Sequence, residues 1–345
     1  MRIPTIDRVI GAGGIGTGML FLSEINKTLG RNESRLVTLS PARDYCKAHI
    51  VLYYIRALLP ERVKVMPVGY VGADQAGAQL LDEMRETGMD ISLVGVTRDR
   101  PTMVSICLQY PDKDGCNFTA SNSACELVSQ EYVESSFEKI EDHGRTMVVV
   151  LPEIKAQAGI AMLNRGKREN AFCALSVAAS DMEYFKNSGA FALCDIIAIN
   201  HGEAAELVGR EGSAGEIAGA AYGYLKEKNP DIMLIVTSGK NGAYTGHKER
   251  LEFVPALPAT VVNTTGAGDA FLGGTLSGLA MGMPFQKGRS DGYFGESMLA
   301  GAAELGAFCA GMAVECEDSI ARVTREAIMQ RIDNNGWRCE KWFTK

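Results

Sequence analysis

Short apolar segments alternate with amphipathic helical segments along most of the chain, and this alternation constrains the fold more than any other feature. The apolar runs predict strands at 63–72, 146–151, 171–178, 195–200, 232–239 and 259–263. Segments with a helical pattern predict helices at 75–88, 202–209 and 268–282. Apolar strands separated by helices are typical of a parallel sheet covered on both faces. We therefore predict an α/β fold with a central, mostly parallel sheet flanked by helices, and ligands beyond the carboxyl ends of its strands.

Residues 92–128 show a different pattern, in which β-branched and alternating stretches surround the turn sequence PDKDG at 111–115. Asp114–Gly115 is a typical hairpin turn. We expect a small β element here that projects from the main sheet. No internal repeat and no linker rich in Pro, Gly or Ser divides the chain, so we expect a single domain over residues 1–345.

The composition excludes several classes of protein. The 35 basic and 42 acidic residues give a net charge of −7, and no long basic run suggests a nucleic-acid surface. No apolar stretch reaches the ~20 residues that span a membrane, and no secretory signal precedes the first strand, so we expect a cytoplasmic location. The nine cysteines contain no C-x-x-C pair, which favours small buried hydrophobes over a zinc site.

The glycine triplet Gly11, Gly13 and Gly16 has the G-x-G-x-x-G spacing of a dinucleotide-binding turn. Such a turn requires a helix after it and an acidic residue about 20 positions further on, at the end of the second strand. Glu33 has about the right distance but precedes the apolar run at 35–40, and the segment after Gly16 lacks a clear helical face. The triplet therefore favours a tight, closely packed turn over a nicotinamide site.

The stretch VVNTTGAGDAFLGG at 261–274 is the most informative part of the sequence. Gly266, Ala267 and Gly268 precede a helix that begins near Asp269. Free amides at a helix start, together with the helix dipole, form an anion site, and glycines let the backbone curl toward it. A carboxylate beside that site can accept a proton while the amides stabilise a phosphoryl group. The alternative is an Asp that only caps the helix.

Four motifs in order resemble the ribokinase-like (PfkB) carbohydrate and nucleoside kinases. They are VGYVGADQAG (68–77), NHGEAAEL (200–207), VTSGKNGAY (236–244) and NTTGAGDAF (263–271). The resemblance covers roughly residues 8–314. It implies a ribokinase-like fold, in which residues 92–128 and part of 12–40 form a β lid. Such a lid often makes a dimer contact, so a homodimer through it is expected.

The resemblance also implies an ATP-dependent kinase with Mg²⁺ and a small-molecule acceptor. Asp269 would be the base, and Gly266, Ala267 and Gly268 the anion hole. Glu203 would act on the metal through water. The nucleotide would lie along Asn200, Thr237, Gly239, Gly242, Ala243, Ala310 and Gly311. Asn200 and Glu203 also fit a helix capping box, and Ala310 and Gly311 also fit a helix–helix contact.

The acceptor half departs from the family pattern. Gly16 occupies the approximate place of a sugar-binding Asp, and the matching region SPARDYCKAH at 40–49 lacks the family's Gly-Gly pair. Gly13, Gly16, Arg43, Asp44 and Lys47 are the candidate acceptor contacts. Arg43 and Lys47 could recognise an anionic acceptor, or else form local ion pairs on a solvated helix start.

Asn263 replaces the Asp that opens the common form of the phosphate motif. In some relatives that Asp helps to bind a monovalent cation, so dependence on such a cation stays open. The leading hypothesis is a small-molecule kinase. A catalytically silent binding protein on the same fold and a nicotinamide oxidoreductase are the alternatives.

Overall fold

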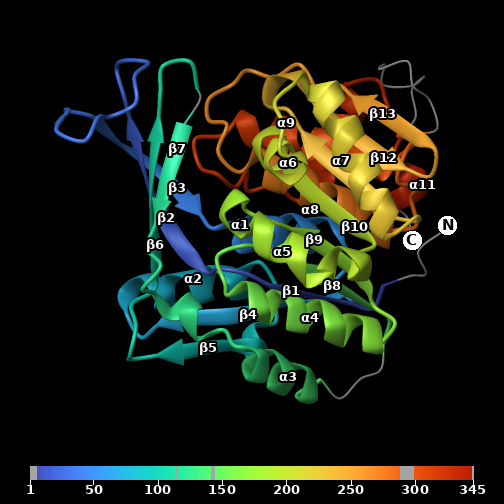
Figure 1. The fold of residues 1–345 in the computed structure, drawn as a ribbon, viewed down its shortest axis with the longest axis horizontal. Helices are drawn as coiled ribbons and strands as arrows, with labels where there is room; N and C mark the ends of the chain where they lie inside the picture. The colour runs from blue at the N-terminus through green and yellow to red at the C-terminus, as the bar shows by residue number, and fades with distance from the viewer. Residues whose placement is uncertain (1–5, 114, 141–143, 288–298, 344–345) are drawn as a thin grey trace.

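The computed structural model describes residues 6–113, 115–140, 144–287 and 299–343, which contain a large and a small sheet (Figure 1). The strands of the large sheet are β1 (Arg8–Ala12), β4 (Lys64–Gly72), β5 (Val94–Thr97), β8 (Thr146–Val150), β9 (Phe172–Ser176), β10 (Ile196–Asn200), β11 (Met233–Thr237), β12 (Ala243–His247) and β13 (Arg250–Val254). They lie in the order β13-β12-β11-β10-β9-β8-β1-β4-β5. The strands from β11 to β5 pair in parallel, while β12 and β13 add an antiparallel edge.

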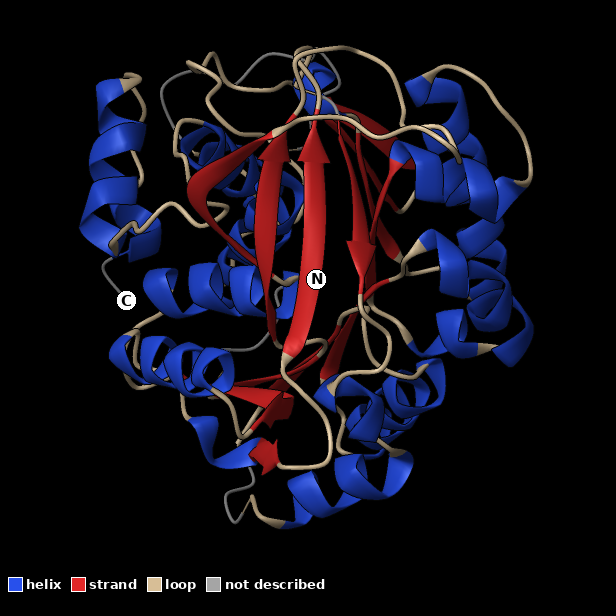
Figure 2. Ribbon diagram, turned by 90° about the vertical axis from the view of Figure 1, so that its left-hand side faces the viewer, coloured by secondary structure: helices blue, strands red, loops and turns tan. Residues whose placement is uncertain are grey.

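Helices cover both faces of the large sheet (Figure 2). They are α1 (Lys47–Leu58), α2 (Gln75–Glu86), α3 (Gln130–Glu138), α4 (Ala156–Arg168), α5 (Met182–Ser188), α6 (His201–Val208), α7 (Ala214–Lys228), α8 (Ala267–Ala280), α9 (Ala302–Val314), α10 (Arg325–Asn334) and α11 (Glu340–Phe343). Helices α1, α2, α8, α9 and α10 share one apolar core, and α3 to α7 share the other. Neighbouring residues of one strand enter opposite cores, as Val9 and Ile10 of β1 do, which explains why the central strands are apolar throughout.

The predicted α/β fold is confirmed, and five of the six strand predictions lie within two residues of the observed bounds. The strand expected at 259–263 is wrong. The amides of Val262 and Asn263 donate instead to the carbonyl of Val314, at 2.7 and 3.2 Å. This segment therefore satisfies its backbone against the end of α9 rather than against a neighbouring strand.

The small sheet stands beside the large one (Figure 1) and has the order β3-β2-β6-β7. Its strands are β2 (Gly16–Leu22), β3 (Thr38–Tyr45), β6 (Met103–Gln109) and β7 (Gly115–Thr119). Strands β6 and β7 pair as the predicted hairpin, with Gln109 opposite Gly115. The expected range 92–128 begins too early, because β5 pairs with β4 of the large sheet.

The expectation that most cysteines are small buried side chains is confirmed. Seven of the nine cysteines are buried: Cys46, Cys107, Cys125, Cys173, Cys194, Cys309 and Cys339. Among the described residues, no helix is both long and apolar enough to cross a bilayer.

Candidate active site

The candidate site lies where the parallel strands end. Strands β1, β8, β9, β10 and β11 finish at Ala12, Val150, Ser176, Asn200 and Thr237. The small sheet begins only four residues after the end of β1, at Gly16, so it rises from this same edge. Ligands of open α/β sheets bind at such an edge.

The turn at 264–266 leads into α8, which begins at Ala267, two residues before the Asp269 expected from the sequence. Gly266 adopts φ +77°, a left-handed conformation that favours glycine. A Cβ at Gly266 would lie 2.5 Å from the carbonyl oxygen of Ser319, so the turn packs directly on the segment after α9. Since the first amides of a helix lack intrahelical partners, the start of α8 can offer those of Gly268 and Asp269 to an anion.

Asp269 lies in the first turn of α8, and its carboxylate faces Lys47, the first residue of α1. The Lys47 Nζ lies 3.4 Å from Asp269 Oδ1 and 3.3 Å from the hydroxyl of Ser176 at the end of β9. Burial raises the pKa of Asp269, and Lys47 acts in the opposite direction. Burial also disfavours the charged form of Lys47, but the carboxylates around it outweigh this effect and raise its pKa.

Asn200 and Glu203 form the capping box at the start of α6. The amide of Asn200 donates to Glu203 Oε2 at 2.7 Å, and the amide of Glu203 donates to Asn200 Oδ1 at 2.9 Å. Burial raises the pKa of Glu203, while Lys47 acts to lower it and Asp269 to raise it. The motif is therefore a capping box whose carboxylate also interacts electrostatically with Lys47 and Asp269.

The expected nucleotide-binding residues occupy two places. Gly268 approaches Thr237, because a Cβ there would lie 3.8 Å from the Thr237 hydroxyl. Thr237 pairs with Ala243 in the hairpin that follows β11. In that hairpin Gly239 and Gly242 adopt φ +52° and +99°. Ala243 itself is fully buried in the core, so it shapes the hairpin rather than offering a contact surface.

On α9, Ala310 is partly exposed while Gly311 is buried. A Cβ at Gly311 would lie 3.3 Å from the Cβ of Leu257, so this glycine allows close packing of the loop that precedes the turn at 264–266. Their contact with a nucleotide stays a prediction.

The residues expected to contact the acceptor do not all lie in one place. Lys47 reaches Asp269, whereas the guanidinium of Arg43 pairs with Glu83 of α2 and stacks over the ring of Tyr45. The Arg43 amide also donates to Asp318 Oδ1 at 2.8 Å. Arg43 is therefore held in β3 by partners on α2 and after α9. Its ion pair joins residues 40 positions apart, so it is not the local pair on a helix start that the sequence offered as the alternative.

Asp44 is buried and accepts hydrogen bonds from its neighbour's amide at 3.0 Å and from the Cys107 thiol at 2.9 Å. It contributes to the electrostatic environment of Asp269. Gly13 and Gly16 pack against protein: a Cβ at Gly13 would lie 2.8 Å from that of Leu151, and one at Gly16 would lie 2.5 Å from the carbonyl oxygen of Met103.

Sequence reasoning missed Glu153, which follows β8 by three residues. It has φ +74°, and its buried Oε2 has no hydrogen-bond partner among the described residues. Burial raises its pKa to about 7, and Lys47 opposes that shift. Strained, unpaired carboxyls cluster at functional sites. The available signal was an acidic residue directly after the buried run 146–151, at the edge where ligands bind.

The small sheet contacts the segment 263–264, just before α8, through polar groups. Gln109 of β6 donates to Asn263 Oδ1 at 3.3 Å, and the Thr264 hydroxyl donates to the Lys113 carbonyl at 2.9 Å. The Ser319 amide donates to the carbonyl of Arg43 at 3.0 Å. The small sheet therefore lies on the turn that precedes α8 and on the segment that follows α9.

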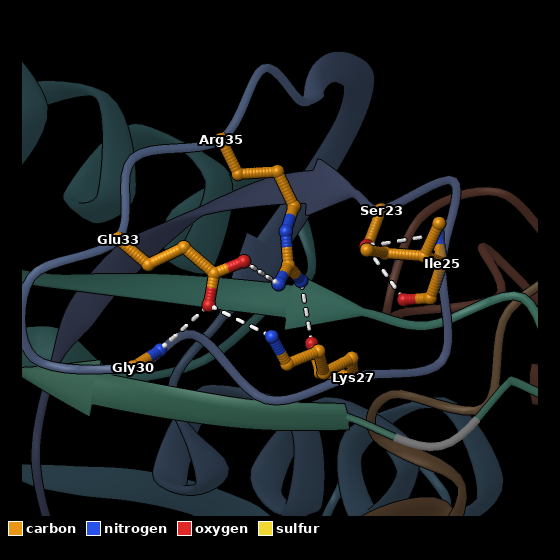
Figure 3. A network of polar contacts seen from close by, with 6 residues as sticks. All are labelled: Ser23, Ile25, Lys27, Gly30, Glu33 and Arg35. Atoms are coloured by element: carbon orange, nitrogen blue, oxygen red, sulfur yellow. Dashed lines mark hydrogen bonds and ion pairs between the residues drawn. The ribbon is translucent and has the colours of Figure 1, made fainter.

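The glycine triplet is not followed by a helix. Gly11 lies in β1 and Gly16 opens β2, so no helix N-terminus is present for a pyrophosphate. Glu33 lies in the loop between β2 and β3. Figure 3 shows its carboxylate accepting hydrogen bonds from the Gly30 amide and the side chains of Lys27 and Arg35. The Arg35 hydrogen bond is the main reason why the pKa of Glu33 falls to about 2. This segment supports no nicotinamide site.

Comparison with known sequences identifies relatives over parts of the chain. The chain is 28% identical to a ribokinase of Lactococcus lactis over 220 residues, which is 63% of this chain and 66% of that protein. It is 38% identical to a fructokinase of Klebsiella pneumoniae over 91 residues, which is 26% of this chain and 28% of that protein. These matches thus span less than two thirds of either relative.

Solved structures share the fold over nearly the full length. A ribokinase of Giardia lamblia has a TM-score of 0.74 at 18% identity, covering 95% of this chain and 99% of that one. A nucleoside kinase of Burkholderia thailandensis in complex with inosine has a TM-score of 0.71 at 21% identity, with 96% and 99% covered. The pfkB family of carbohydrate kinases matches residues 54–325, well over half of the 345 residues. The chain therefore belongs to the pfkB family of carbohydrate kinases.

Proposed function

We propose that this protein is an ATP-dependent kinase that transfers the γ-phosphoryl group to a hydroxyl of a sugar-like or nucleoside-like small molecule. The observation that carries the proposal is the carboxylate of Asp269, which lies in the first turn of α8 beside the first amides of that helix and 3.4 Å from Lys47. The names of the Lactococcus ribokinase and of the inosine-bound nucleoside kinase support this acceptor class.

The chemistry follows from that arrangement. The acceptor hydroxyl loses its proton to Asp269 as its oxygen attacks the γ-phosphorus. The bond from that phosphorus to the bridging oxygen breaks, and ADP leaves. The amides at the start of α8 stabilise the charge that spreads over the transferred oxygens. Lys47 favours the ionised form of Asp269, which keeps the base available for the proton.

The residues at the start of α6 fit the Mg²⁺ that the family resemblance implies. Glu203 uses one oxygen in the capping box, and its other oxygen accepts no hydrogen bond from the described residues. Mg²⁺ usually keeps several waters, so a single carboxylate that orients such waters is a suitable partner. When bound, the ion would neutralise charge on the phosphate oxygens.

The charges around Lys47 favour a neutral, polyhydroxylated acceptor over the anionic one that Arg43 and Lys47 suggested. Lys47 interacts with the carboxylates of Asp269, Glu203 and Glu153, while Arg43 is paired with Glu83. One cation among several carboxylates offers little attraction to a further anion. The Oε2 of Glu153 is itself buried, so this residue adds negative charge near Lys47 rather than a contact surface.

Replacing Lys47 by methionine should move the acid limb of the pH–activity profile to higher pH. Because Lys47 acts to lower the pKa of Asp269, its removal raises that pKa and leaves less ionised base at a given acid pH. The measurement is kcat/KM against pH. The matched control is Arg43→Met, which removes a cation that pairs with Glu83 instead. Equal shifts in both variants would contradict this role of Lys47.

The decisive test of the function is an ADP-release screen with Mg–ATP against sugars, sugar acids, nucleosides, cyclitols and their phosphates. A kinase releases ADP in proportion to the product formed with at least one acceptor. Binding of ATP without turnover on any acceptor would favour the catalytically silent alternative.

We also propose that two copies associate through the outer face of the lid. Met19, Ile106 and Phe118 lie side by side on neighbouring strands and are 40%, 43% and 73% exposed. Such an apolar row on a projecting sheet is typical of a contact surface. Phe118→Asp should therefore give a monomer in light scattering at a concentration where the parent is a dimer. Tyr184→Asp, which changes an exposed ring on α5, should leave the mass unchanged.

A further inference from the structure

Asn263 joins three parts of the molecule at the turn before α8, residues 263–266, which we call the phosphate turn. Asn263 is only 3% exposed. Its Oδ1 accepts hydrogen bonds from the amide of Thr265 at 3.0 Å and from Gln109 of the lid at 3.3 Å. Its Nδ2 donates to the carbonyl of Glu317, after α9, at 2.8 Å. The side-chain amide thus links the lid, the turn before α8 and the 314–319 segment.

The orientation of this amide is determined by its backbone partners. The Thr265 N–H can only donate, and the Glu317 C=O can only accept. Exchanging the oxygen and nitrogen of Asn263 would therefore break both contacts. The positive end of the amide dipole points at Glu317, and no other assignment satisfies both neighbours.

An aspartate at position 263 would lack the N–H that donates to the Glu317 carbonyl. A carboxylate carries acceptors only, so one oxygen would face the Glu317 carbonyl with no proton between them. Two acceptors that face each other inside a protein are unfavourable unless a positive charge lies between them. A monovalent cation bound by these oxygens would provide that charge. With asparagine, the side-chain N–H places a partial positive charge between the two oxygens. The amide nitrogen has no lone pair to offer, so it is no ligand for a cation.

We propose that the amide of Asn263 takes the place of a monovalent cation in this protein, so that the phosphate turn is held without K⁺. The part of the proposal that concerns activity rests on the proposed kinase function. The part that concerns the turn does not, because the contact can be followed through thermal stability alone.

The first arm of the test compares the melting temperature of the unmodified protein in KCl and in tetramethylammonium chloride at equal ionic strength. A cation that binds only the folded state raises the melting temperature by mass action. We expect the two values to agree within about 1 °C, since no such site has to be filled. A K⁺-specific rise of several degrees would overturn the proposal. This arm needs no variant, so it decides the matter even if a substitution prevents folding.

The second arm uses Asn263→Asp, which should make the stability of the phosphate turn depend on a monovalent cation. In tetramethylammonium chloride we expect its melting temperature to fall by roughly 2–5 °C, from the loss of one buried donor. KCl should restore most of that loss. Absence of any K⁺-specific recovery in a folded variant would contradict the proposal.

Asn229→Asp is the matched control. Asn229 also accepts from the amide two residues on, at 3.0 Å, and donates Nδ2 to a backbone carbonyl, that of Cys194, at 2.7 Å. It is only partly buried, so water can replace the lost donor. K⁺-specific recovery of the same size in both variants would show that the Asn263 site is not special, and would overturn the proposal.

The third arm follows ADP release once an acceptor is known. Turnover of the parent should differ less than about twofold between the two salts, whereas Asn263→Asp should be activated by K⁺ about tenfold. If no acceptor supports ADP release, the kinase proposal fails, and the melting temperatures still decide the role of Asn263.

Discussion

Asp269→Asn should lower kcat by about 10²–10⁴, which is the usual contribution of a positioned general base. The amide keeps the size of the side chain and its place in the first turn of α8, but it cannot accept the proton of the acceptor hydroxyl. ATP binding should change little, because the amides of the turn remain. Turnover by ADP release and ATP affinity by calorimetry measure the two quantities separately.

Asp82→Asn is a suitable control for this variant. Asp82 is an exposed carboxylate that pairs with Arg85 on the surface of α2, so its neutralisation should leave turnover within about twofold. A normal melting temperature for Asp269→Asn would show that lost turnover is chemical. Turnover close to that of the parent would remove Asp269 from the mechanism, and with it the main support for the proposed function.

Gly266→Ala is expected to impair both folding stability and activity. At φ +77° a Cβ costs about 1 kcal/mol or more in backbone strain. It would also lie 2.5 Å from the Ser319 carbonyl oxygen and 3.1 Å from the Cδ1 of Ile50, so the turn has to move. Because donors of an anion site act over a narrow range of distance, we expect kcat to fall by about 10². Chemical denaturation and steady-state kinetics test the two effects.

Gly282→Ala is the control that separates the backbone strain of a left-handed residue from the steric clash at Gly266. Gly282 follows the other end of α8 with φ +83°, yet a Cβ there meets nothing within 4 Å. The control should therefore show the backbone cost, about 1 kcal/mol, with normal kinetics. If both variants lose activity to the same degree, the effect comes from α8 as a whole rather than from the geometry of the anion site.

The sequence alone determined the layers of the fold and the presence of a glycine turn that leads into α8. The apolar runs of β8, β10 and β11 predict buried parallel strands, because both faces of such a strand are covered. The glycines of this segment also predicted the turn before α8. Capping boxes and left-handed turns are encoded within about four residues, so periodicity and local residue type suffice to predict them.

The tertiary structure alone decided which of the charged residues meet. Arg43 and Lys47 are four positions apart, but one pairs with α2 and the other with the start of α8. Glu153 became a candidate only in the structure, because it follows β8 at the sheet edge and interacts there with Lys47 and Asp269. The segment at 259–263 satisfies its amides against α9 rather than in a sheet. These outcomes depend on partners distant in the chain, and pair interactions between such groups are set by which elements the topology brings within a few ångströms.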